Sequence, residues 1–302
     1  MALRLGTVKV SGAERAACLL DDGRVRLLPS ELGDALDIVS RGPAFVAELR
    51  SLCAGLGETV ALVDVNVLSP LRRFRRDVLC TGWNYWDHFY ESEGKREGQD
   101  MPKPVAPTFF TKGPRTAIAP CDPVAFDPMV SAKWDYEAEI VVIVGQGGRS
   151  IPQDRAMEHI WGFCLANDVS QRDLQRRHGG QWLKGKSIDN TMPLGPWIVH
   201  RDDVVLKGLA FECELNGTLM QHATVDDMAF PIPELISELS FGMTLEAGDV
   251  LLTGTPSGIG NARVPPVYLA DGDRLIVRGT GLGELDNLVT ATDLSSYHKG
   301  DH

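Results

Sequence analysis

The sequence lacks closely spaced cysteine pairs, and no apolar run in it approaches the length of a membrane-spanning helix. Such a helix needs about 20 consecutive apolar residues, so we expect no membrane partner. The opening stretch, MALRLGTVKV, alternates like a strand and lacks the apolar core and cleavage site of a signal peptide. The six scattered cysteines indicate buried thiols in a reducing compartment, not a disulfide framework. We therefore expect a cytoplasmic protein.

Positive charge is also scarce. The formal net charge is −11, which argues against nucleic acid as a principal partner, because binding to phosphates needs a basic surface. One basic stretch, RRFRR at 72–76, departs from this balance, and we interpret it as a solvated surface near a domain junction. With 43% hydrophobic and 24% charged residues, the chain has the composition of a folded globular protein.

Several catalytic motifs are missing. The sequence contains no G-x-S-x-G elbow, no H-E-x-x-H pair and no phosphate-binding P-loop, so it gives no support to a serine hydrolase, a zinc protease or a nucleotide-phosphate enzyme. The stretch GTGLGEL at 279–285 has the glycine content of a dinucleotide loop. No strand–helix–strand pattern surrounds it, and we set that interpretation aside.

The pattern of elements predicts an α+β protein that is mainly β. Residues 1–72 form a predicted small α+β domain, with strands within 4–28 around an Asp-Gly turn, helical spacing in DALDIVS and FVAELRSLCAGLG, and a strand in VALVDVNVL. Residues 73–302 lack the regular strand–helix alternation of a doubly wound sheet. Within them we expect helices at 152–159 and 232–240, and strands at 77–82, 138–145, 160–168, 196–200, 209–215, 248–254 and 273–278. The polar, proline-containing segment 91–107 predicts a mobile loop or lid.

Two glutamates stand at the mouth of an apolar run in DYEAEIVVIVG, residues 135–145. Residues two apart on a strand point to one face, so Glu137 and Glu139 are expected side by side, where their charges repel. Asp168 ends the next apolar run and offers a third carboxylate. A hard ion, Mg²⁺ or Mn²⁺, would relieve the repulsion, because its preferred ligands are oxygens. An exposed strand edge that carries acids is the alternative, and spacing alone favours it.

Other segments carry residues suited to proton transfer and to anion binding. His88 and Glu91, three apart, share a face of a helical turn, where the carboxylate would orient the imidazole to activate a water. Lys186 lies in a loop from which it can reach a site as a cationic donor. The turn after DVLLTG offers backbone N–H groups and the Thr255 hydroxyl to an anion. A surface hydrogen bond and a solvated lysine are the simpler alternatives for His88–Glu91 and Lys186.

Taken in order, these segments resemble the fumarylacetoacetate hydrolase family. The resemblance covers about 77–290 and rests on GWNYWDHFYE, FFTKG, DYEAEIVVIVG, GFCLANDVSQRDLQ, KGKSIDNTMPLGPWI, NGTLMQ and GDVLLTGTPSGIG. It implies a mixed β-sandwich or β-roll core, a homodimer, and one divalent metal per subunit. Residues 73–302 would be the catalytic domain, and residues 1–72 are similar to the small N-terminal domain of many members.

The resemblance also implies roles for individual residues. The metal ligands fall on Glu137, Glu139 and Asp168, the same three carboxylates that strand geometry brings together. The catalytic residues fall on His88, Glu91 and Lys186, and the substrate-binding positions on Arg172, Gln175, Gly254 and Thr255. Lys112 of FFTKG matches a family position with a supporting role.

On this basis we expect a Mg²⁺- or Mn²⁺-dependent hydrolase that cleaves a C–C bond in an acylpyruvate-type 1,3-diketo acid, such as fumarylpyruvate or another intermediate of aromatic catabolism. The substrate would be a small 2-oxo or diketo acid. Two alternatives stay open. An oxaloacetate-type decarboxylase or a 2-hydroxydienoate isomerase or tautomerase would use the same apparatus, and a non-catalytic metal-dependent binding protein would keep only the fold. The long lid segment leaves the identity of the substrate open.

Overall fold

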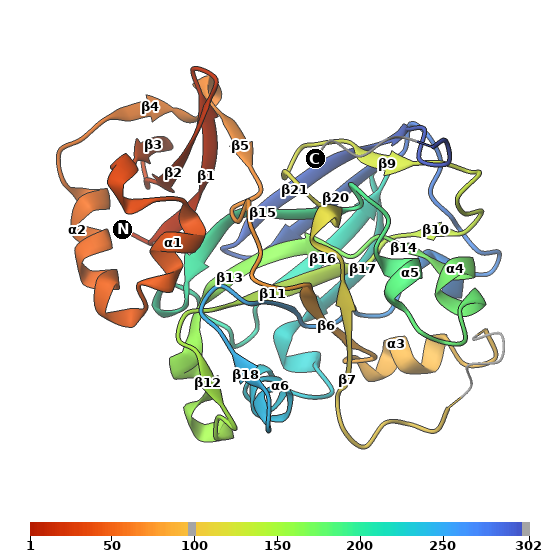
Figure 1. The fold of residues 1–302 in the computed structure, drawn as a ribbon. Coiled ribbons are helices and arrows are strands. Elements are labelled where there is room, and N and C mark those ends of the chain that lie inside the picture. Colours follow the sequence, from red (N-terminus) through yellow and green to blue (C-terminus); the bar gives the residue numbers. More distant parts are fainter. Residues whose placement is uncertain (96–100, 298–302) are drawn as a thin grey trace.

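The computed structural model describes residues 1–95 and 101–297. Its architecture combines one large mixed sheet, a five-stranded sheet and few helices (Figure 1), which confirms the expected α+β, mainly β class. Within the described ranges, no helix is both long and apolar enough to cross a membrane. Part of the predicted 91–107 lid, residues 96–100, lies outside the described residues.

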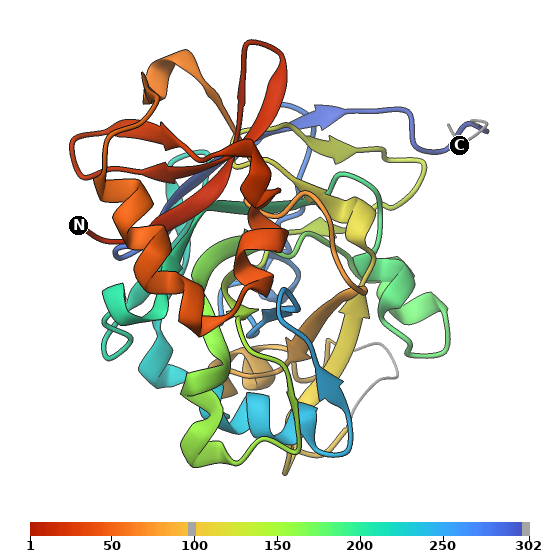
Figure 2. The same cartoon turned by 60° about the vertical axis from the view of Figure 1, so that its left-hand side comes forward.

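The N-terminal part of the chain folds as predicted, with strands around a turn at Gly23, where φ is +79°, followed by two helices. Asp34 caps the first helix in a reciprocal capping box with Asp37. Figure 2 shows the two helices side by side next to the strands. The elements are β1 Arg4–Val10, β2 Ala13–Leu19, β3 Arg24–Leu27, α1 Ala35–Ser40, α2 Val46–Ala54, β4 Thr59–Ala61 and β5 Asn66–Leu68.

The predicted single strand VALVDVNVL is wrong in detail. A short 3₁₀ turn, Leu62–Asp64, separates β4 from β5. The interruption has a topological reason, because β4 pairs with β3 at the sheet edge, whereas β5 must cross back to pair with β1. The predicted helix at 152–159 is likewise a 3₁₀ helix, Gln153–His159.

The large sheet has the order β4-β3-β2-β1-β15-β13-β11-β19-β6-β7. The N-terminal strands extend it directly, because β1 pairs antiparallel with β15, with Arg4 opposite Val199. A domain boundary near residue 72 therefore stays a prediction. The remaining strands of this sheet are β6 Val78–Gly82, β7 Thr108–Lys112, β8 Ala117–Ile118, β11 Ala138–Val144, β13 Ile160–Asn167, β15 Met192–His200 and β19 Val250–Leu252.

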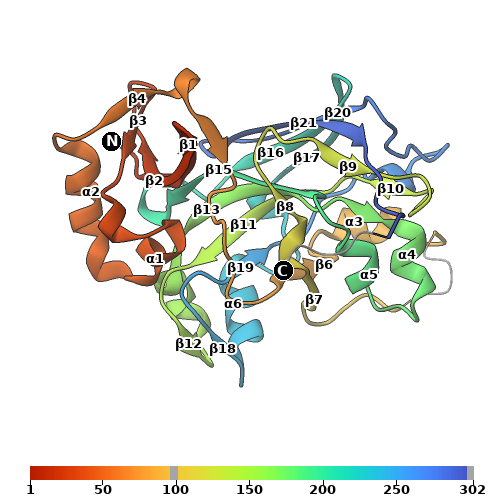
Figure 3. The same cartoon turned by 45° about the horizontal axis from the view of Figure 1, so that its top comes forward.

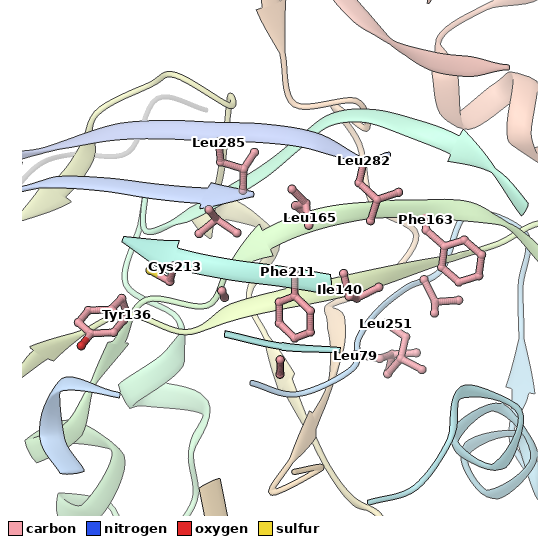
Figure 4. Close-up of a cluster of buried hydrophobic side chains, with 14 of the residues drawn as sticks. Leu79, Tyr136, Ile140, Phe163, Leu165, Phe211, Cys213, Leu251, Leu282 and Leu285 are labelled. Carbon is pink, nitrogen blue, oxygen red and sulfur yellow. The ribbon is translucent and has the colours of Figure 1, made fainter. Parts of the chain in front are cut away.

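A five-stranded sheet packs against the large sheet and completes a β-sandwich. Figure 4 shows side chains of both sheets meeting in one apolar core, with Ile140 of the large sheet close to Phe211. The second sheet has the order β17-β16-β20-β21-β9. Its strands are β9 Val124–Phe126, β16 Ala210–Leu215, β17 Thr218–Thr224, β20 Arg274–Gly279 and β21 Gly283–Ala291.

Strand β11 is apolar on both faces because both are covered. Ile140 and Val142 point into the core between the sheets, whereas Val141 and Ile143 point into a second core that the N-terminal helices share. A strand buried on both faces has a continuous apolar run in its sequence, which is the pattern of IVVIV at 140–144. The two glutamates at its start are therefore carried into the interior.

Three short helices gather at one end of the molecule, away from the N-terminal strands (Figure 3). These are α3 Trp86–Glu91, α4 Arg172–Arg177 and α5 Leu183–Lys186, while α6 Ile232–Ser240 covers another edge. The two-stranded pairs are β10 Trp134–Asp135 with β14 Ser170–Gln171, and β12 Gly148–Arg149 with β18 Thr244–Leu245. Helices α3, α4 and α5 supply residues to the site described below.

The basic stretch at 72–76 is not simply solvated, because its arginines tie two regions of the chain together. Arg73 lies 2.6 Å from Asp34 and 2.9 Å from Asp37, at the start of α1. Arg76 reaches the other way and lies 3.1 Å from the buried Asp249. Arg72, Arg73 and Arg75 are exposed, as expected of a solvated surface, whereas Arg76 is half-buried.

The expectation of six buried thiols is wrong at three positions. Cys18 on β2 and Cys53 on α2 form a disulfide, with their Cα atoms 6.1 Å apart. Cys121 is a free, exposed thiol. The remaining three are buried and free, as expected: Cys80, Cys164 and Cys213. The pair joins residues 35 positions apart, and only the packing of α2 on β2 brings them together.

Candidate functional site

Three buried carboxylates converge at the end of two neighbouring strands. Strand β11 pairs with β13 so that Ala138 lies opposite Asn167, which places Glu137 and Asp168 at the same end. The Asp168 N–H donates to the Glu137 carbonyl at 2.7 Å and fixes this junction. Glu137, Glu139 and Asp168 each place a carboxylate oxygen within 4.8 Å of the others. The alternative of an exposed acidic strand edge is excluded, because all three are buried.

Two buried lysines neutralise part of this carboxylate cluster. Lys186 Nζ lies 2.6 Å from Glu137 Oε2 and 2.9 Å from Asp168 Oδ2, and Lys112 Nζ lies 2.8 Å from Asp168 Oδ1. Burial alone would lower the pKa of Lys186, but the charges of Asp168 and Glu137 outweigh it and raise that pKa. Lys186 is therefore a fixed cation at neutral pH, not the solvated lysine of the alternative interpretation.

Arg172, at the start of α4, is buried and pairs with two carboxylates. Its Nε donates to Asp135 Oδ2 at 2.9 Å, and its Nη1 donates to Glu137 Oε1 at 2.6 Å. Asp135 in turn accepts the N–H groups of Gly260 and Asn261. Arg172 thus holds Glu137 in place, and this geometry favours a positioning role over the substrate contact expected from the sequence.

Glu139 is the member of the cluster without a cationic partner. Among the described residues its polar contact is the Gly254 N–H, which donates to Oε2 at 2.6 Å. Burial, followed by the charges of Asp168 and Glu137, raises the pKa of Glu139 well above its usual value. When Asp135 is counted with the cluster, the site holds four buried carboxylates. The buried cations that contact them are Lys112, Arg172 and Lys186, so one negative charge is left over. Three clustered carboxylates, one of them unneutralised, fit a divalent cation with a preference for oxygen ligands.

His88 and Glu91 form the predicted dyad on α3. His88 Nδ1 lies 2.8 Å from Glu91 Oε1, and Glu91 Oε2 accepts the Gly258 N–H at 2.8 Å. The carboxylate is therefore fixed on both oxygens and orients the ring. With Nδ1 engaged, the other ring nitrogen, Nε2, is the one that can exchange a proton with a ligand.

The polar groups of the turn after β19 form hydrogen bonds within the protein. The Gly254 N–H is engaged with Glu139, so it is not the free donor that the sequence predicted. The Thr255 hydroxyl donates to the Ala138 carbonyl at 2.9 Å and accepts from Gln221 Nε2 at 2.8 Å. A Cβ atom added to Gly254 would lie 2.8 Å from Asn84 Cβ, so a residue larger than glycine does not fit at this position. The substrate contacts of Gly254 and Thr255 stay predictions.

One cavity joins most of these residues. It is lined by Glu137, Lys186, His88, Arg172, Gln175 and Thr255, which the sequence singled out, and by others that it did not, namely Thr81, Gly82, Trp83, Ser92, Phe110, Arg176, Trp182, Ile259 and Asn261. The Thr81 hydroxyl is buried and has no hydrogen-bond partner among the described residues. Trp83 carried a local signal, as part of GWNYWDHFYE, whereas Thr81 reads as an ordinary strand residue.

Comparison with known proteins agrees with this geometry. The family model described as fumarylacetoacetate (FAA) hydrolase C-terminal matches residues 77–290. Oxaloacetate tautomerase YisK of Bacillus subtilis is 37% identical over 266 residues, which are 85% of this chain and 86% of the relative. Oxaloacetate tautomerase FAHD2A, mitochondrial, of Homo sapiens is 37% identical over 253 residues, 83% of this chain and 78% of the relative.

Solved structures agree as well. A fumarylacetoacetate hydrolase from Exiguobacterium antarcticum superposes with a TM-score of 0.83 at 33% identity, covering 96% of this chain and 100% of the other. A probable 2-hydroxyhepta-2,4-diene-1,7-dioate isomerase from Mycobacterium abscessus gives 0.79 at 29%, covering 97% and 100%. The chain therefore belongs to the fumarylacetoacetate hydrolase family.

Proposed function

We propose that this protein interconverts the enol and keto forms of a small 2-oxo acid of the oxaloacetate type. The observation that carries the proposal is the placement of the His88–Glu91 dyad and the Glu137 end of the carboxylate cluster on one cavity. The relatives named oxaloacetate tautomerases support it. They favour the isomerase or tautomerase alternative over the acylpyruvate hydrolase that we expected first.

Glu137, Glu139 and Asp168 would hold a divalent cation, Mg²⁺ or Mn²⁺. When bound, such an ion polarises the oxygen atoms of a 2-oxo acid and favours negative charge on them. The residues around the carboxylates add to this effect. Lys186 is a buried cation beside Glu137 and Asp168, and the unpartnered Thr81 hydroxyl can donate to a substrate oxygen.

The reaction needs one proton removed and one proton added. The enol form loses the proton of its 2-hydroxyl group and gains a proton at C3 to become the keto form. His88 is the group on the cavity that can carry a proton in this way, because Glu91 engages Nδ1 and leaves Nε2 for the substrate. Arg176 also lines the cavity and offers a cation to the second carboxylate of a dicarboxylic acid.

The experiment is to follow the loss of enol oxaloacetate by ultraviolet absorbance, with Mg²⁺ or Mn²⁺ and after chelation. We expect the wild type to accelerate ketonisation, and His88→Asn to lose about 100-fold or more of that rate. His222→Asn is the matched control, because that histidine is 57% exposed on β17 and away from the cavity. A rate no faster than that of buffer, with either cation, would refute the proposal.

Hydrolysis of an acylpyruvate is the second candidate function. The dyad favours it, because an oriented imidazole can also take a proton from water, which then attacks the distal carbonyl. Pyruvate release from acylpyruvates, measured with a coupled dehydrogenase on the same preparation, separates the two activities. If pyruvate forms and oxaloacetate ketonisation is not accelerated, the hydrolase is the better assignment. If neither reaction is accelerated, a non-catalytic binding protein remains.

A further inference from the structure

A second cavity, rich in aromatic residues, adjoins the carboxylate site. We call it the aromatic annex. It shares Trp83, Phe110 and Trp182 with the first cavity, so the two cavities meet at these three side chains. Its other lining residues are Met101, Thr108, Phe109, Gly180 and Gln181. None of the lining residues in the described part of the chain is charged, in contrast to the site beside it.

The three rings that line both cavities pack closely against one another. The Trp182 ring lies edge-on to Trp83 at 4.6 Å between centroids and to Phe110 at 5.0 Å. Gly82 makes room for this arrangement, because a Cβ atom there would lie 2.4 Å from the Trp182 ring. Trp83 itself adopts a φ of +50°, which bulky residues rarely do. The rings are thus held in place by the backbone of β6 and of the residue that follows it.

Phe110 marks the border between charge and apolar surface. Lys186 Nζ, which contacts Glu137 and Asp168, lies 5.3 Å from the centre of the Phe110 ring. A ligand with its 2-oxo acid group at the carboxylate cluster therefore meets Phe110 and Trp182 within a few bonds. Oxaloacetate would either point its second carboxylate toward the annex or leave the annex empty. None of the described residues that line the annex is a cation that could pair with that carboxylate. An apolar substituent matches that surface.

We propose that the annex binds an aryl or branched alkyl substituent at C3 of a 2-oxo acid, so that arylpyruvates are substrates besides oxaloacetate. This inference rests on the proposed tautomerase function for its chemistry. The enol of such an acid loses the proton of its 2-hydroxyl group and gains one at C3, with no other bond made or broken. The annex fixes the substituent, and the carboxylate cluster and His88 act on the common 2-oxo acid part.

The test compares phenylpyruvate with pyruvate, because the two differ only by the phenyl group. Calorimetric titration of the Mg²⁺-loaded protein should show phenylpyruvate binding on the order of tenfold more tightly, as expected for burial of part of a ring. Met101→Ala removes a side chain from the lining of the annex, and Thr108→Phe fills the space. Each should reduce that ratio to near one. Val105→Ala is the control, because Val105 is an exposed apolar residue of the same segment that lines neither cavity.

The outcomes separate the annex from the proposed function. Equal affinity for the two acids in the wild type, or the same ratio in Thr108→Phe as in Val105→Ala, overturns the annex. Thermal melting checks that each variant is folded, and either of the two annex variants suffices. If the affinity ratio behaves as expected and neither oxaloacetate nor phenylpyruvate is ketonised, the annex stands as a binding site and the tautomerase proposal fails alone.

Discussion

Replacing Glu139 with glutamine tests the cation site most directly. Glutamine has the same shape, and its carbonyl oxygen can still accept the Gly254 N–H, so the turn after β19 keeps its anchor. The substitution removes a negative charge that neither lysine contacts. Because the pKa of Glu139 is raised, ionising this side chain opposes folding once the pH exceeds the usual carboxyl value. We expect the metal-free variant to be at least as stable as the metal-free wild type at neutral pH.

The response to cations should change in the opposite direction. At a cation concentration 100 times its Kd, binding stabilises the wild type by about 2.7 kcal/mol, which raises Tm by about 5 °C in a chain of this size. One opposite charge at ~4 Å is worth about 4 kcal/mol at an effective dielectric constant of 20, so losing it weakens binding by at least ~100-fold. The same cation concentration then adds under about 0.5 kcal/mol, a shift of roughly 1 °C or less.

The assay is thermal melting with and without Mg²⁺ or Mn²⁺. Glu48→Gln is the matched control, because Glu48 is exposed on α2, far along the chain from the site, and should keep the full shift. A Glu139→Gln protein that retains the wild-type shift would show that the cation binds elsewhere. A variant that is less stable than wild type without cations would contradict the view that Glu139 is an uncompensated charge.

Three further predictions concern other parts of the molecule. Glu91→Gln keeps the acceptor for the Gly258 N–H but removes the charge beside His88, so ketonisation should slow at least about tenfold while the cation-induced Tm shift is unchanged. Gly82→Ala would place a methyl group against the Trp182 ring, and denaturant titration should show a loss of about 1–3 kcal/mol. Asp203 accepts hydrogen bonds from the Arg50 guanidinium and the Leu3 N–H. Burial alone would raise the pKa of Asp203, but these two hydrogen bonds outweigh burial and lower that pKa. Asp203→Asn should therefore lower the free energy of unfolding by about 1 kcal/mol at pH 7, and this difference from wild type should disappear as the pH falls through the lowered pKa of Asp203. Asp202→Asn is the control, because Asp202 is 66% exposed, and it should change the free energy of unfolding little at any pH.

Elements with strong local patterns were predicted correctly from the sequence. The strands around the Asp-Gly turn, the helix at 232–240 and the buried strand after Glu137 all match, because alternation, capping and apolar runs act over a few residues. The errors arose where a distant partner interrupts a local pattern. One example is the break between β4 and β5, which depends on pairing with two different strands.

The features of the candidate site also divide into those set by local sequence patterns and those set by distant partners. The spacing of Glu137 and Glu139, the apolar run before Asp168 and the three-residue step from His88 to Glu91 are local, and each determined its own geometry in advance. The sequence by itself therefore determined the mainly β fold, the side-by-side placement of Glu137 and Glu139 and the approach of Glu91 to His88, whereas Asp168 joins the two glutamates only because β11 pairs with β13.

Only the tertiary structure decided the surroundings of these groups. Lys112, Arg172 and Lys186 reach the carboxylates from separate segments, the Gly254 N–H engages Glu139 across 115 residues, and Trp182 closes on Trp83 to build the annex. Such contacts depend on which strands pair and which helices dock, and no short-range pattern encodes them. The charge that Glu139 leaves unbalanced, and the apolar surface beside it, exist because the folded chain brings these remote residues to one end of the sandwich.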